Sequence, residues 1–228
     1  MNKLRFNDFY EFSRVVKDID CAMMMQHNPE FHAWNINQIS FNNIDIQLGE
    51  LGSGNLLEGV SKSDGYILYL PLTKKAKYIG NGQVINPGSI MIFEPGCDFT
   101  LSTTVAHDWI SIFMPSKMIA TKHGDEGRIS ATDFNETKYK VRITPANNLI
   151  AERFKFIVKQ IMATAEIYQG CLEDSPASTS IIESVKQIAN SVLDEGYLNR
   201  QNLLGRHKIP RNKLIKECHE FIESHEPK

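Results

Sequence analysis

Histidine and cysteine are the side chains of this sequence best suited to bind a metal or act as a nucleophile. Two of its seven histidines, His27 and His32, are five residues apart and do not share one helical face. His107 precedes Asp108, a pairing that could serve as a general base but fits a solvated turn better. No two of the four cysteines form a C-x-x-C motif, which favours reduced thiols in the cytoplasm. They are Cys21, Cys97, Cys171 and Cys218.

Short motifs that bind phosphates or activate a nucleophile are absent from the sequence. It contains no G-x-S-x-G, no P-loop and no G-x-G-x-x-G. Gly49, Gly52 and Gly54 fit hairpin turns, and Asp125-Glu126 fits a solvated loop tip. We therefore predict no catalytic residue and no cofactor.

The elements that would position a site begin with short strands between residues 38 and 115. Ile44, Ile46 and Leu48 alternate with other residues, the period of a half-buried strand. The segment GYILYLPL is almost entirely apolar, and Asn81-Gly82 is a strong signal for a tight hairpin. Turn signals recur about every ten residues, so we predict roughly eight strands in an all-β barrel or sandwich.

Helical patterns flank these strands. A short helix is predicted over 7–20, with Asn7 or Asp8 as its N-cap. After a polar connection, Pro145 opens a helix that reaches about residue 169. A second helix covers 178–195 and ends at Gly196.

The C-terminal part of the sequence has two sections. Residues 196–209 carry two glycines and mixed polarity, which is typical of a linker. Residues 210–228 then predict an amphipathic helix, which needs an apolar partner. Its stripe is formed by Leu214, Ile215, Cys218, Phe221 and Ile222.

The stretch INPGSIMIFEPGCDF resembles the second half of a cupin barrel. In metal-binding cupins this motif has a histidine three residues after its proline-glycine turn, and here Phe99 holds that position. The other cupin motif needs two histidines and a glutamate, but YILYLPLTKKAKYIG has no histidine. We therefore predict no metal site.

Aromatic side chains are the main candidates for a ligand pocket. About half of the residues of a barrel strand face inward, where they either fill the core or line a cavity for one small ligand. The candidates on the predicted strands are Tyr66, Tyr69, Tyr78, Phe93, Phe99 and Trp109.

Over residues 6–228 the chain resembles the N-terminal portion of an AraC-type transcriptional regulator. The resemblance is carried by DFYEFSRVV, by GYILYLPL, INPGSIMIFEPGCDFTLST and DWISIFMP, by the two helices, and above all by IPRNKLIKECHEFIESH. It implies an α+β fold: a cupin-like β-barrel, a helical hairpin, and the first helix of a DNA-binding domain whose remainder is missing.

The implied domains are a sensor barrel with a short N-terminal helix at 1–145, a dimerisation hairpin at 146–195, a linker at 196–209, and the start of a helix-turn-helix domain at 210–228. The partners implied are a second subunit, a small-molecule effector, and DNA through the missing C-terminal domain. A net charge of −2 fits a chain without the basic, phosphate-binding part. We expect a cytoplasmic protein with no membrane segment.

One stripe of the second helix is the predicted dimer seam. The same stripe could instead pack on the chain's own barrel. Its residues are Ile181, Val185, Ile188 and Val192. Two other functions stay open at this point: a metal-dependent cupin-like enzyme, and a stand-alone protein-interaction module.

Overall fold

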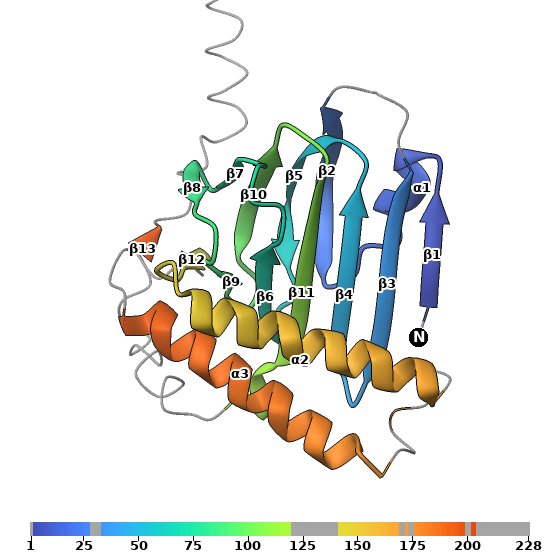
Figure 1. Cartoon of the computed structure of the whole chain (residues 1–228). Helices are drawn as coiled ribbons and strands as arrows, with labels where there is room; N and C mark the ends of the chain where they lie inside the picture. The colour runs from blue at the N-terminus through green and yellow to red at the C-terminus, as the bar shows by residue number, and fades with distance from the viewer. Residues whose placement is uncertain are drawn as a thin grey trace, which may run out of the picture.

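The structure is a computed structural model of the 228-residue chain. It describes residues 2–27, 33–119, 141–168, 172, 176–198 and 202–203. In these residues two antiparallel sheets face each other, and two long helices cover the outer face of the larger sheet (Figure 1). The predicted succession of strands and then a helical hairpin is confirmed.

The larger sheet has eight strands among the described residues. Their order is β1 (Asn2–Phe6), β3 (Trp34–Phe41), β4 (Ile44–Leu51), β11 (His107–Pro115), β6 (Gly65–Pro71), β9 (Met91–Phe93), β12 (Val141–Ile143) and β13 (Asn202–Leu203). The described part of the smaller sheet has five. Their order is β2 (Ile19–His27), β5 (Gly54–Ser61), β10 (Asp98–Thr103), β7 (Tyr78–Gly80) and β8 (Gln83–Ile85).

Tight turns fix the register of two hairpins. Asn81 and Gly82 have φ angles of 46° and 83°, as a two-residue turn with both residues left-handed requires. They join β7 to β8, so the predicted Asn81-Gly82 hairpin is confirmed. Asn42 and Asn43, with φ angles of 48° and 62°, join β3 to β4 in the same way.

Alternation along the central strands creates two separate cores. On β11, Trp109 and Phe113 face the space between the sheets, whereas Ile110 and Ile112 face the helices. The neighbouring strand β6 is buried on both faces, which explains the almost unbroken apolar run of its sequence. We call the core between the two sheets the barrel core and the core between the larger sheet and the helices the helix core. The two cores therefore lie on opposite faces of the larger sheet.

The two long helices are α2 (Asn148–Ile167) and α3 (Ser178–Leu198). Asn147 caps α2, since its side-chain oxygen accepts hydrogen bonds from the backbone N–H groups of Leu149 (3.1 Å) and Ile150 (3.3 Å). We predicted that the second helix ends at Gly196, but α3 continues through this residue to Leu198. A Cβ at Gly196 would lie 2.3 Å from Ile92 Cδ1, so glycine allows this helix to approach the sheet closely.

The N-terminal helix is shorter than predicted. This helix is α1 (Phe9–Ser13). Its N-cap is Asp8, one of the two residues predicted for that position, and the Asp8 carboxylate accepts a hydrogen bond from the Glu11 N–H at 2.8 Å. The chain then turns through Asp18, with a φ of 72°, into strand β2. A 3-10 turn, η1 (Ser116–Met118), follows β11.

The predicted linker is partly regular structure. Residues 196–198 belong to α3, and Asn202–Leu203 form β13, which pairs with Val141 and Arg142 of β12. The predicted final helix at 210–228 lies outside the described residues, as do His32 and the Asp125-Glu126 loop.

Candidate ligand cavity

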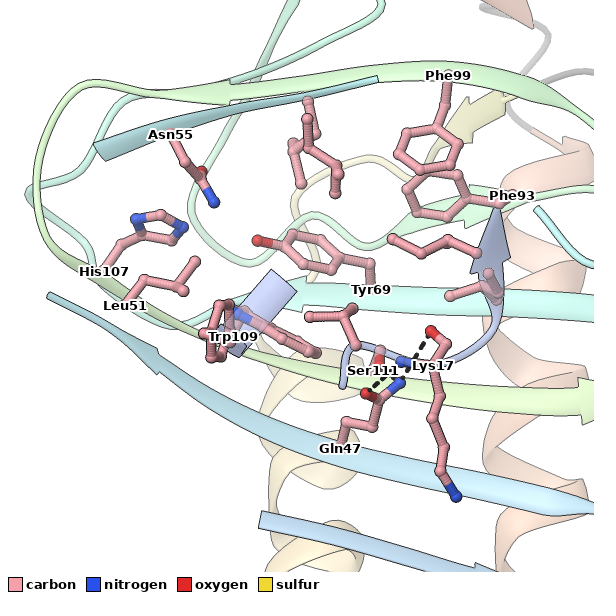
Figure 2. A pocket seen from close by; sticks show the side chains of 16 residues that line it. Lys17, Gln47, Leu51, Asn55, Tyr69, Phe93, Phe99, His107, Trp109 and Ser111 are labelled. Atoms are coloured by element: carbon pink, nitrogen blue, oxygen red, sulfur yellow. Dashed lines mark hydrogen bonds between the residues drawn. The ribbon is translucent and has the colours of Figure 1, made fainter. Parts of the chain in front are cut away.

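A cavity of about 50 Å³ lies between the two sheets. Strands of both sheets line it, and part of the wall comes from the chain between α1 and β2 (Figure 2). Most of its lining is apolar, formed by Phe12, Val16, Ile19, Leu51, Leu57, Ile67, Tyr69, Phe93, Phe99, Leu101 and Trp109. The polar members are Lys17, Gln47, Asn55, His107 and Ser111.

Aromatic rings in edge and stacked contacts form much of the wall. Tyr69 stacks on Trp109 with ring centroids 5.8 Å apart, and it meets Phe93 edge-on at 6.5 Å. Phe93 in turn meets Phe99 edge-on at 4.7 Å. Such contacts add to the burial energy and hold the rings in fixed orientations. Gly49 permits the indole to lie against β4, because a Cβ there would fall 2.3 Å from Trp109 Cε2.

At one end of the cavity, three buried polar side chains contact one another: Asn55, Thr103 and His107. Nδ1 of His107 lies 2.9 Å from the Val105 carbonyl oxygen, which can only accept, so we assign the ring proton to Nδ1. The Thr103 hydroxyl donates to Asn55 Oδ1 at 3.1 Å and lies 3.0 Å from His107 Nδ1. Burial lowers the pKa of His107 to about 4, so the imidazole is neutral at physiological pH.

Asn55 and Tyr69 direct polar atoms toward this end. Figure 2 shows the amide nitrogen of Asn55 and the Tyr69 hydroxyl pointing into the space beside His107. Neither atom makes a hydrogen bond to another described residue. Burial raises the pKa of the Tyr69 phenol well above its usual value, so the hydroxyl keeps its proton.

A second polar cluster fixes the wall at Lys17 and Asp18. Gln47 accepts a hydrogen bond from Lys17 N–H at 3.0 Å, and its amide nitrogen donates to the Lys17 carbonyl and to Asp18. The Lys17 ammonium points away from the cavity toward Ser40 Oγ at 2.8 Å and Asp45 at 3.4 Å (Figure 2). No charged atom of this lysine therefore faces the cavity.

Four of the six predicted pocket residues line the cavity, namely Tyr69, Phe93, Phe99 and Trp109. Tyr78 is buried beside it, donates to the Asp108 carbonyl at 2.9 Å and meets His107 edge-on. Tyr66 lies on the opposite face of β6, against the helix core, and does not line this cavity. The difference follows from strand alternation, which places Tyr66 and Tyr69 on opposite faces.

The predicted dimer seam requires a correction. Its four residues lie inside the molecule's own helix core, where Val185, Ile188 and Val192 are completely buried and Ile181 almost so. The stripe of α3 thus packs on the larger sheet, as the alternative reading of the sequence allowed. Burial of this kind leaves these side chains unable to contact a second subunit.

The structure also shows where several candidates for metal and thiol chemistry lie. No three His, Cys, Asp or Glu side chains among them are grouped so that they could hold a metal ion. Phe99, at the position of the cupin histidine, is buried in the cavity wall. Cys97 is a free, buried thiol. No helix in the described part of the chain is long and apolar enough to cross a membrane.

Solved structures with the same architecture include a transcription factor. The AraC-like transcriptional activator CuxR matches 98% of this chain and 78% of its own, with a TM-score of 0.56 and 13% sequence identity. The chain has the fold of an AraC-like regulator. The resemblance predicted from the sequence is thereby confirmed at the level of the fold, as is the cupin-like α+β class.

More distant likenesses involve a second regulator and a cupin. ToxT of Vibrio cholerae, solved with an unsaturated fatty acid bound, matches 80% of this chain and 63% of its own, with a TM-score of 0.39 and 10% identity. A cupin-like protein of Thermotoga maritima matches 45% and 76%, with a TM-score of 0.32 and 12% identity. No family model matches the sequence, and neither does any curated protein.

Proposed function

We propose that this chain is the effector-sensing and dimerisation region of an AraC-type transcription regulator. The observation that carries the proposal is the shared fold with an AraC-like activator over 98% of the chain. The effector occupies the cavity between the sheets. DNA is bound by a helix-turn-helix domain on the C-terminal side of this region, and the regulator works in the cytoplasm.

The sheet shared by both cores supports a path from effector to helices. Tyr69 and Trp109 line the cavity, while Leu68 and Ile110 on the same two strands contact the helix core. A ligand that displaces β6 or β11 must therefore change the packing beneath α2 and α3. Packed cores transmit such shifts because they do not deform continuously.

The dimer contact is proposed on α2 in place of α3. Leu149, Phe156 and Ile167 of α2 expose 79%, 61% and 77% of their surface. Leu149, Phe156 and the exposed Ala163 are seven residues apart, and Ile167 follows one turn later. A seven-residue apolar repeat is the seam by which two helices pack, so a second copy of α2 is the partner that fits.

Sedimentation velocity of a concentration series tests this proposal. Phe156→Glu places a charge at the centre of the seam and is expected to weaken self-association at least about tenfold. Thr179→Glu, at an exposed position of α3, is the matched control and should associate like the parent. Circular dichroism verifies that both variants fold. Association of Phe156→Glu at the parent's affinity would show that α2 is not the seam.

A further inference from the structure

The cavity contains two nearly buried hydrogen-bonding groups that have no hydrogen-bond partner among the described residues. Asn55 and Tyr69 expose only 5% and 7% of their surface. The Asn55 oxygen is already engaged by Thr103, which directs its amide nitrogen into the cavity (Figure 2). Buried polar atoms are normally satisfied, so this pair is placed to donate to an acceptor that the described part of the chain does not supply.

No formal charge faces that position from the cavity's lining. The Lys17 ammonium is held outside by Ser40 and Asp45, and His107 is neutral because burial lowers its pKa to about 4. An ionised group brought into such a site loses its hydration and finds no opposite charge. The cavity therefore disfavours both carboxylates and ammonium ions.

The volume limits the size of the occupant. A cavity of about 50 Å³ has room for roughly three to five water molecules, whereas benzene occupies an apolar cavity of about 150 Å³ in a protein core. Phe93 and Phe99 form the apolar wall away from Asn55 and His107 (Figure 2). The occupant thus combines one polar end with a short apolar part.

We propose that the cavity binds a short alcohol, ketone, aldehyde or amide of about three to five non-hydrogen atoms. Its oxygen accepts hydrogen bonds from the Asn55 amide nitrogen and the Tyr69 hydroxyl, and its alkyl part packs against the apolar lining of the cavity. This inference rests on the proposed function, because it names the chemical class of the effector.

Two pairs of probes with matched shapes test the inference: acetone against acetate, and propan-2-ol against isopropylammonium. Each is titrated into the protein while the Trp109 indole N–H is followed by ¹H–¹⁵N NMR. The neutral probes should bind with dissociation constants of about 0.1–10 mM, as expected for so few atoms. The charged probes should bind at least about tenfold more weakly.

Two variants of one strand sharpen the test. Tyr69→Phe removes only the hydroxyl and should weaken acetone binding about five- to tenfold. Tyr66→Phe, on the opposite face of β6, should leave it unchanged. The inference is overturned if a charged probe binds as tightly as its neutral counterpart, if none of the four binds, or if Tyr69→Phe matches the parent. Selective binding of the neutral probes, together with unchanged association of Phe156→Glu, would instead overturn the dimer contact alone.

Discussion

Asp18 combines burial, a left-handed backbone and a charged partner. Its φ is 72° and its side chain is 1% exposed, while Lys62 Nζ lies 2.6 Å from Oδ1. Burial raises its pKa from 3.8 to about 6, against the opposing effect of Lys62. The folded protein therefore holds this proton more tightly than the unfolded chain does. Ionisation of Asp18 weakens the fold, and this loss develops as the pH rises from about 4 to about 6.

Asp18→Asn should remove this pH dependence. Asparagine tolerates the left-handed backbone and keeps the shape of the side chain. The free energy of unfolding of the variant, minus that of the parent, should rise by about 1–3 kcal/mol between pH 4 and pH 7. Urea denaturation at both pH values measures it. Asp20→Asn, at an exposed position on β2, is the control. If the free-energy difference from the parent changes equally with pH for both variants, Asp18 is not the source of the pH dependence.

Side chains of the cavity were predictable to different degrees. Aromatic residues on strands predict a barrel interior, and four of the six candidates line the cavity. The polar residues Gln47 and Asn55 were missed, and His107 was explained as a solvated turn although it is 2% exposed. The partners of Gln47 and Asn55 lie on segments distant in sequence, so only the folded sheets bring them together. The alternation around Gln47 was a signal that could have placed it on the inner face with Gly49 and Leu51.

At the scale of elements, Gly196 shows how tertiary contact overrides a local signal. A glycine near the end of a helical pattern predicts termination, because its backbone accepts a left-handed cap. Here α3 continues to Leu198, and the missing side chain leaves room for the fully buried Ile92. The sequence does not reveal which glycine faces a neighbouring element.

Gly196→Ala should destabilise the protein despite the better helix propensity of alanine. The new methyl group would meet Ile92 Cδ1 at 2.3 Å, and overpacking costs about 1–3 kcal/mol. Adding Ile92→Val removes that methyl group and should recover about 1 kcal/mol or more of the loss. Denaturant unfolding of the two single variants and the double variant measures the coupling. Additive effects would contradict the close contact.

The N-terminal elements were the least predictable. The pattern over 7–20 predicted one helix, yet α1 ends at Ser13 and β2 begins at Ile19. Val15 and Val16 favour extended backbone, and hydrogen bonds from Gln38 to the Val15 carbonyl (2.6 Å) and between Gln47 and Lys17 hold the segment on the sheet. These bonds span more than twenty residues, a distance that local periodicity does not report.

At the scale of the whole molecule, the described residues form two cores that share one sheet. Strands β6 and β11 contribute Tyr69 and Trp109 to the barrel core, and Leu68 and Ile110 to the helix core. Neither side can lose its packing without exposing the apolar face of these strands. We therefore expect the barrel and the helical hairpin to unfold together, although the sequence suggested separate domains meeting at residue 145.

Ile188→Ala tests this coupling from the helix side. Ile188 is completely buried on α3, so the truncation should lower the free energy of unfolding by about 2–5 kcal/mol. Gln187→Ala, at the exposed neighbouring position, should change it by less than about 0.5 kcal/mol. Far-UV circular dichroism follows the helices, and tryptophan fluorescence follows Trp34 and Trp109, both in the barrel core. Coincident, equally shifted midpoints mean that the shared sheet binds both layers into one cooperative unit. An earlier loss of helix with an unshifted fluorescence transition would mean that the hairpin folds independently, and an effector in the barrel could not then act on it through β6 and β11.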